Sequence, residues 1–144
     1  MKELSEEERI KAFLEWAACN GAMFSKTEIK CYGKNFRGVH AVSNISPNER
    51  IVTIPFKMIL TASMGWKNSS LGKKIKDSGV TINYPYCTYL SCLLLDASKD
   101  PTHFFHPYYN IFPTDASTFP FFYTNQDLIA LQELSIARIS LFFI

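Results

Sequence analysis

The chain has 144 residues, of which 47% are hydrophobic and 19% are charged. This length suits one domain or part of one, and the composition indicates a globular protein rather than a disordered one. A net charge of only +2, with no basic stripe, argues against a nucleic-acid-binding protein. The densest basic cluster, Lys73, Lys74 and Lys76 near Lys67, is better interpreted as a solvated loop or helix end.

The N-terminus and the apolar runs argue against secretion and against a membrane span. The first eight residues are acidic and lack an apolar core, so they do not form a signal peptide. No apolar run approaches the roughly 18–20 residues that cross a bilayer. We therefore expect an intracellular protein that is not secreted, located in the cytoplasm, the nucleus or an organelle.

The residues that most often bind metals or perform catalysis are scattered. The cysteines lack Cys-x-x-Cys spacing and matching histidine pairs, so free, buried thiols are expected rather than disulfides or a metal site. These cysteines are Cys19, Cys31, Cys87 and Cys92. His103 and His106 have no acidic or thiol partner at ligand spacing and are expected at the surface. No metal site and no catalytic residue is assigned, because paired carboxylates and a nucleophile beside a base are also missing.

A helix is predicted to begin after Ser5. Ser5 and Glu8 have the spacing of a capping box, in which each side chain bonds the backbone amide of the other. The following apolar residues recur at helical spacing, and Asn20-Gly21 is a typical helix end. The apolar face consists of Ile10, Phe13, Leu14 and Ala17.

A small antiparallel sheet is predicted across residues 29–60. Ile29 to Tyr32 reads as a strand, Gly33-Lys34-Asn35 as its turn, and Phe36 to Val42 as a second strand with alternating side chains. Ser46-Pro47-Asn48 fits a type I turn. The β-branched run from Ile51 to Ile54 predicts a further strand, which Pro55 ends because it lacks a backbone donor.

The rest of the chain reads as mainly helical. The glycine-rich polar segment 62–80 predicts a loop with a short helix, and 84–97 predicts a helix that is apolar all round and hence buried. Aromatic residues cluster at 104–112. A final helix is predicted from Thr124 or Asn125, with Asp127 in its first turn. Its apolar face would comprise Leu128, Leu131, Leu134 and Ala137 or Arg138.

The C-terminal sequence, Ile139-Ser140-Leu141-Phe142-Phe143-Ile144, is unusually apolar for a chain end. Burying each of its large side chains is worth roughly 1.5–3 kcal/mol. We expect this tail either to fold back into its own core or to meet a neighbour, which could be a further segment or another chain.

Short motifs spread along the chain, in matching order and rough spacing, resemble one family of proteins. They are Phe13-Leu14-Glu15-Trp16 with Asn20-Gly21, the run Phe36–Val42, the segments Ile51–Pro55 and Ile59–Thr61, His103–Pro113, and Phe119–Leu134 with its Leu131-Gln132. Together they are similar to SET-domain protein methyltransferases, in the branch of the plant Rubisco large-subunit and actin-histidine methyltransferases.

The resemblance implies an α+β fold, the N-terminal half of a SET domain, with a small antiparallel β-sheet and a helical insert. Residues 1–61 would hold the first helix and the sheet, and 62–144 the insert. In the family, a Gly-x-Gly turn of the first hairpin approaches S-adenosylmethionine through its main chain. The matching positions here are Phe36, Arg37 and Gly38. The implied cofactor-binding residues are Asn35, Arg37 through its backbone, and Gly38, while Phe36 would direct a ring toward the cofactor.

By resemblance, the complete enzyme would transfer a methyl group from S-adenosylmethionine to a lysine or histidine of a protein substrate. The catalytic half of the family's domain would follow Ile144, so the chain is expected to be truncated and inactive alone. An alternative is a non-catalytic SET-like scaffold subunit that docks into a larger protein assembly through its apolar tail. A third reading is a helical binding module whose hairpin resembles the family by coincidence.

Overall fold

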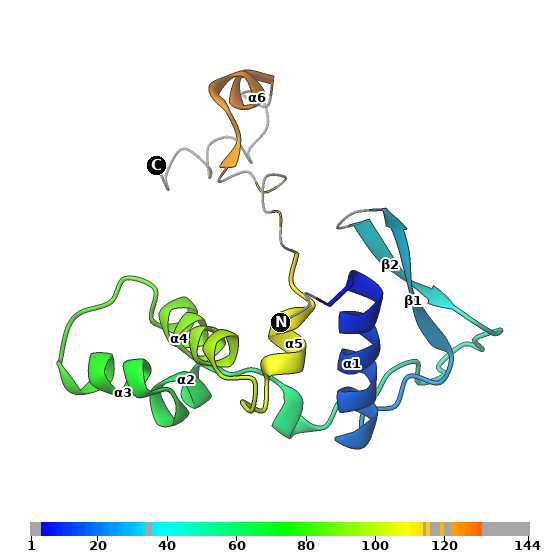
Figure 1. The fold of residues 1–144 in the computed structure, drawn as a ribbon, viewed down its shortest axis with the longest axis horizontal. Helices are drawn as coiled ribbons and strands as arrows, with labels where there is room; N and C mark the ends of the chain where they lie inside the picture. The colour runs from blue at the N-terminus through cyan, green and yellow to red at the C-terminus, as the bar shows by residue number, and fades with distance from the viewer. Residues whose placement is uncertain (1–3, 34–35, 114, 116–118, 120–121, 131–144) are drawn as a thin grey trace. The chain divides into compact units, whose positions relative to one another are not determined.

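The computed structural model describes residues 4–33, 36–113, 115, 119 and 122–130. It divides into two compact units, Met1–Phe112 and Pro113–Ile144. The described residues combine several helices with one two-stranded antiparallel sheet, which confirms the predicted α+β class (Figure 1).

Helix α1 spans Glu6–Cys19 and begins as predicted. The backbone amide of Ser5 donates to Glu8 Oε2 at 2.7 Å, and the Glu8 amide donates to Ser5 Oγ at 3.2 Å. These bonds with Ser5 hold the pKa of Glu8 below its usual value. The chain leaves the helix through Gly21, whose φ of 94° favours glycine. The predicted apolar face is confirmed, with Ile10 and Ala17 buried and Phe13 and Leu14 half-buried.

The sheet is a hairpin of β1, Thr27–Gly33, and β2, Phe36–Ala41. Ile29 pairs with Val39 and Lys30 with Gly38, and the register shifts between Cys31 and Gly33. These strands confirm the predicted runs, while the turn residues 34 and 35 lie outside the described residues.

The predicted strand at 51–54 is wrong. Thr53 forms only an isolated bridge with Met23, with backbone N–H to O=C distances of 2.9 Å in both directions. β-branched residues favour extended backbone, but a strand also needs a partner that runs alongside it. Here the partner segment leads directly from α1 into β1 and meets Thr53 at a single residue pair.

The turn at 46–49 differs from the predicted type I. The Glu49 amide donates to the Ser46 carbonyl at 3.1 Å, and Asn48 has a φ of 64°. A left-handed third residue defines a type II turn. Proline at the second position suits both types, so only the backbone of Asn48 distinguishes them.

Residues 62–77 form two helices rather than the predicted loop with a short helix. Helix α2 spans Ala62–Asn68 and α3 spans Ser70–Asp77, following the short 3₁₀ helix η1, Phe56–Met58. A Cβ on Gly65 would lie 2.0 Å from the Tyr89 carbonyl oxygen, and one on Gly72 would lie 2.2 Å from the Gly65 oxygen. These glycines therefore allow close helix contact instead of marking a loop.

Helix α4, Pro85–Lys99, carries proline in its first turn as predicted. Its buried side is formed by Tyr89, Cys92, Leu93 and Ala97. The expectation of burial all round is wrong, because Tyr86 is 71% exposed and Leu95 41% exposed. The core cluster joins Leu93 and Ala97 of α4 to Phe105, and the side chains packed against it are Trp16, Leu60, Met64 and Tyr109.

The predicted aromatic cluster links the helices. It surrounds the short helix α5, His106–Asn110, which contacts both α1 and α4 (Figure 1). The Trp16 ring lies 5.3 Å from Phe104 and 6.2 Å from Phe105, both near edge-to-face. Such rings bury large apolar areas and favour this geometry.

In the second unit, α6 spans Asn125–Ala130 and begins where predicted. The Thr124 amide and hydroxyl donate to Asp127 Oδ2 at 2.9 and 2.6 Å, and these bonds lower the pKa of Asp127. The later predicted face residues, Leu131, Leu134, Ala137 and Arg138, and the tail 139–144 lie outside the described residues.

The cysteines are free, but only Cys92 is buried. The expectation of buried thiols is wrong for the other three, which are exposed. Burial raises the pKa of the Cys92 thiol. Across the described part of the chain, no helix combines the length and the apolar character needed to cross a bilayer.

Candidate functional site

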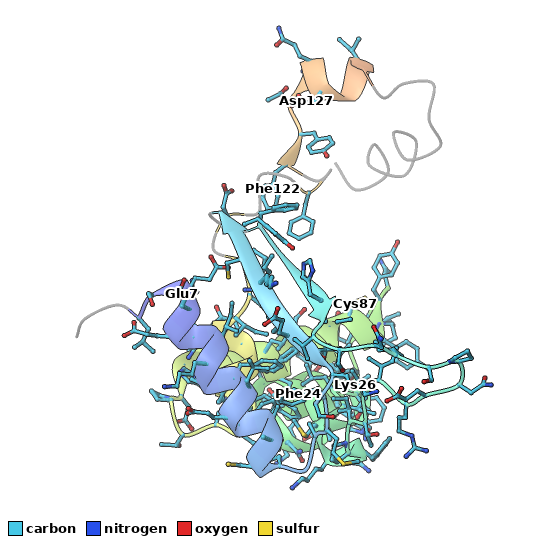
Figure 2. All side chains as sticks on the ribbon, turned by 90° about the vertical axis from the view of Figure 1, so that its right-hand side faces the viewer. Glu7, Phe24, Lys26, Cys87, Phe122 and Asp127 are labelled. Carbon is cyan, nitrogen blue, oxygen red and sulfur yellow. The ribbon has the colours of Figure 1, made fainter. Side chains whose placement is uncertain are left out.

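The two faces of the β1–β2 hairpin have different roles. Because side chains alternate along a strand, the pairing places Ile29 and Val39 on one face and Lys30 and Gly38 on the other. Ile29 shares cavities with α1 residues, so its face is turned toward that helix. Figure 2 shows the hairpin beside α1, with Lys26 where β1 begins and Glu7 in the first turn of the helix.

The Arg37 side chain fastens the hairpin to the helices. Its Nη1 lies 3.3 Å from Glu6 Oε1, and its Nη2 donates to the carbonyl of Ile111. A second arginine joins α1 to α5 nearby, because Arg9 Nη1 donates to the Asn110 carbonyl at 3.1 Å. The guanidinium of Arg37 is thus engaged within the chain.

Gly38 lies between two rings on the outer face. A Cβ at this position would have His40 Nε2 at 3.5 Å and Tyr32 Cε2 at 3.6 Å as its nearest neighbours, which is ordinary contact. Tyr32 Oη and His40 Nε2 form a hydrogen bond. The backbone of Gly38 is not left-handed. The rings of Tyr32 and His40 therefore flank Gly38, which is half-buried, and the glycine does not relieve backbone strain.

Phe36 begins β2 in extended conformation, with its side chain 67% exposed. Its ring centroid lies 5.7 Å from that of Tyr32. Arg37 and Gly38 are consecutive residues of β2, so they lie on opposite faces of the hairpin. Asn35 lies outside the described residues.

Ion pairs flank this region. Lys30 Nζ lies 2.9 Å from Glu28 Oε1, and this bond raises the pKa of Lys30. At the open end of the hairpin, Lys26 pairs with Glu49, and the Ser46 amide donates to the same carboxylate at 2.9 Å. The bond from Lys26, followed by that from Ser46, lowers the pKa of Glu49. No sequence pattern indicated the Lys26–Glu49 pair.

The face turned toward α1 is incompletely covered. A cavity of about 160 Å³ lies there, lined almost entirely by apolar side chains of α1, the hairpin and segment 52–54. Val39 remains 69% exposed, Val52 45% and Ile54 43%. The hairpin therefore lacks the packing that usually covers the apolar side of a sheet.

The two histidines form hydrogen bonds with backbone groups in and beside the turn between α4 and α5. His106 Nδ1 donates to the Ala97 carbonyl at 2.6 Å, and the Phe105 amide donates to His103 Nδ1 at 3.2 Å. Both are half-buried, so the expected surface placement is wrong. Within the described residues, no three His, Cys, Asp or Glu side chains gather as metal ligands would.

Comparisons with known proteins find sequence similarity to one kind of enzyme. No family model matches it. Actin-histidine N-methyltransferases of Rhinolophus ferrumequinum and of Canis lupus familiaris are each 26% identical to it over 126 residues. The match covers 88% of this chain but 21% of theirs, so the chain spans about a fifth of the length of these curated relatives. A match of that length includes the hairpin and α2–α5, and it supports a distant methyltransferase relationship.

Proposed function

We propose that this chain forms the N-terminal part of a SET-type, S-adenosylmethionine-dependent protein methyltransferase. The observation that carries the proposal is the β1–β2 hairpin with a glycine at position 38, where the SET resemblance places the cofactor turn. The similarity to actin-histidine N-methyltransferases extends across this hairpin. The acceptor would be a histidine or a lysine of a protein substrate.

The described residues fit one wall of a cofactor pocket. Gly38 has no Cβ, so a ligand that displaces the neighbouring Tyr32 and His40 rings can approach its amide and carbonyl closely. The neighbouring Arg37 side chain is held by Glu6 and the Ile111 carbonyl and does not obstruct that approach. S-adenosylmethionine would supply an electrophilic methyl group, and the chain would contribute backbone contacts from Arg37 and Gly38, together with Asn35.

Methyl transfer requires the acceptor nitrogen in line with the sulfonium, and this alignment needs groups on both sides of the reacting atoms. The matched region is about a fifth of the relatives' length. We therefore propose that this chain acts only together with further catalytic residues and is inactive by itself.

A chimera tests the proposal. The matching segment of the Canis lupus familiaris actin-histidine N-methyltransferase is replaced with the corresponding residues of this chain. Tritium transfer from methyl-labelled S-adenosylmethionine to actin is then measured. Transfer by the folded chimera is expected. A chimera that melts cooperatively but transfers no label, while the parent enzyme is active, would contradict the proposal.

Phe36→Gly in the same chimera probes the turn. Phe36 occupies the position of the family's first glycine, and its exposed ring limits close approach. The change is expected to tighten S-adenosylmethionine binding. Unchanged affinity would show that this turn does not face the cofactor.

A scaffold role has one observation in its favour, the uncovered apolar side chains Val39, Val52 and Ile54. An assembly partner would cover such a surface. This reading predicts a folded chimera that binds no S-adenosylmethionine. It also predicts that Val39→Asp abolishes co-sedimentation of the chain with its assembly without reducing helix content.

A further inference from the structure

A second cavity, of about 280 Å³, lies between α2, α4 and the turn before α5. Its floor is apolar and consists of Met64, Leu93, Phe104 and Phe105. Leu93 is 2% exposed and Phe105 5% exposed, and both belong to the core cluster. Two of the four floor residues therefore belong to the core cluster, and none of the four comes from the hairpin.

The rim of this cavity carries hydrogen-bond donors. Lys57 contributes an ammonium group and Asn68 a side-chain amide. The third rim residue is His103, whose Nδ1 accepts the Phe105 amide at 3.2 Å. A neutral ring that accepts at Nδ1 has its proton on Nε2, so the remaining nitrogen is a donor. Three donors around an apolar floor favour a ligand that joins an apolar group to an anionic one.

The chain segment around this cavity is positively charged, like the ammonium group of Lys57. Residues 56–83 contain five lysines and one aspartate, a net charge of +4 in a chain of +2, so the remainder carries −2. None of the ion pairs among the described residues involves these lysines. Lys76 instead lies 5.2 Å from the centre of the Trp66 ring. The field over α2 and α3 therefore attracts acidic partners.

One nearby carboxylate, that of Asp100, opposes this attraction. It accepts from the Thr102 amide at 2.8 Å and from the Thr102 hydroxyl at 2.7 Å. Both bonds go to Oδ1 and lower the pKa of Asp100, so its carboxylate keeps its negative charge. Asp100 does not line the cavity.

The cavity volume of about 280 Å³ limits the size of the group that can bind there. Pockets for small organic ligands usually enclose about 300–1,000 Å³, so this cavity lies just below their range. It has room for one or two side chains on an open rim. A protein segment that anchors by a single side chain suits this size.

We propose that this cavity docks an acidic protein segment, with one large apolar side chain on the floor and flanking carboxylates at Lys57 and His103. This interaction would recruit a partner or substrate protein. The docking proposal does not depend on whether the hairpin binds a cofactor.

Methyl NMR of the 144-residue chain tests the site. The probe is a short peptide with a central leucine flanked by glutamates. We expect saturable shifts of the Met64 and Leu93 methyl signals, and weaker binding as salt rises from about 0.05 M to about 0.3 M. Matched peptides with serine for the leucine, or with lysines for the glutamates, are expected to bind at least about tenfold more weakly, a difference of about 1.4 kcal/mol.

Charge reversal supplies the matched variants. Lys57→Glu is expected to weaken peptide binding at least about fivefold, whereas Arg50→Glu, the same kind of change at an exposed residue that does not line the cavity, is expected to leave it nearly unchanged. Equal loss in both variants would overturn the proposal. So would equal binding of the lysine peptide, shifts confined to other methyl groups, or preferential binding of a single-stranded oligonucleotide.

Discussion

The helices α2 to α5 and the hairpin beside α1 are packed to different degrees. In the helices, Ala97 and Ser69 are 0% exposed, and backbones approach so closely that Gly65 has no room for a Cβ. On the hairpin, Val39 stays 69% exposed above an apolar cavity. The helices are packed against one another, whereas the hairpin remains partly uncovered.

The difference follows from the two kinds of backbone pairing. A helix satisfies its own amides and carbonyls, and a few close contacts then fix its position. A two-stranded sheet has two open edges and is only marginally stable without added strands or a covering layer. Stability should therefore reside in α2–α5 rather than in the hairpin.

The largest expected contrast is between Leu93→Ala and Val39→Ala. Leu93 is 2% exposed at the centre of the core, so its truncation is expected to lower the free energy of unfolding by about 2–5 kcal/mol. Val39→Ala should cost less than about 1 kcal/mol, mostly lost strand propensity. Urea unfolding followed by circular dichroism measures both. Equal losses would contradict the contrast in packing.

Two glycines give the next contrast. Alanine favours a helix by about 1 kcal/mol over glycine, but a Cβ at Gly65 would lie 2.0 Å from the Tyr89 carbonyl oxygen. Such overpacking costs about 1–3 kcal/mol or more, so Gly65→Ala is expected to destabilise the chain. Gly38→Ala meets nothing closer than 3.5 Å and should be nearly neutral. A stabilised Gly65→Ala protein would refute the close helix contact.

Arg37 joins the two regions. Arg37→Met removes the Glu6 ion pair and the bond to the Ile111 carbonyl, both partly exposed. The expected cost is about 1–2 kcal/mol of unfolding free energy, measured in urea. Arg37→Lys keeps the charge without the planar fork and should give an intermediate loss. Wild-type stability in Arg37→Met would mean that the hairpin is not held at this point.

The smallest effect is a pH dependence at the open end of the hairpin. The folded-state pKa of Glu49 is lowered by Lys26 and Ser46. Its contribution to stability is therefore present above the ordinary glutamate pKa of about 4.3 and is lost as pH falls through the lowered value. Glu49→Gln should melt below wild type at neutral pH and together with it in strong acid. A gap that persists in acid would contradict this assignment.

Local signals in the sequence predicted the elements they control directly. The Ser5–Glu8 capping box and Pro85 each act within one helical turn, and the alternating strands of the hairpin require only the pleat. Gly65 was misread because its role depends on Tyr89, which is distant in sequence. The β-branched run around Thr53 suggested a strand, but among the described residues it forms one isolated bridge, to Met23.

The candidate site was predictable to the same extent. Resemblance indicated Arg37 and Gly38, which the structure places side by side in β2. It did not indicate that the Arg37 side chain is engaged by Glu6 and Ile111, because those contacts join residues far apart in the sequence. The rim of Lys57, Asn68 and His103 was missed for the same reason, since three separate elements bring it together.

Calorimetric titration of S-adenosylmethionine into the chimera, with and without Gly38→Ala, tests the central claim most directly. The account predicts binding by the chimera and at least about tenfold weaker binding after the added methyl group, with unchanged melting. A folded chimera that binds no S-adenosylmethionine, or binds it equally well with alanine at position 38, would contradict the assignment of the hairpin to the cofactor.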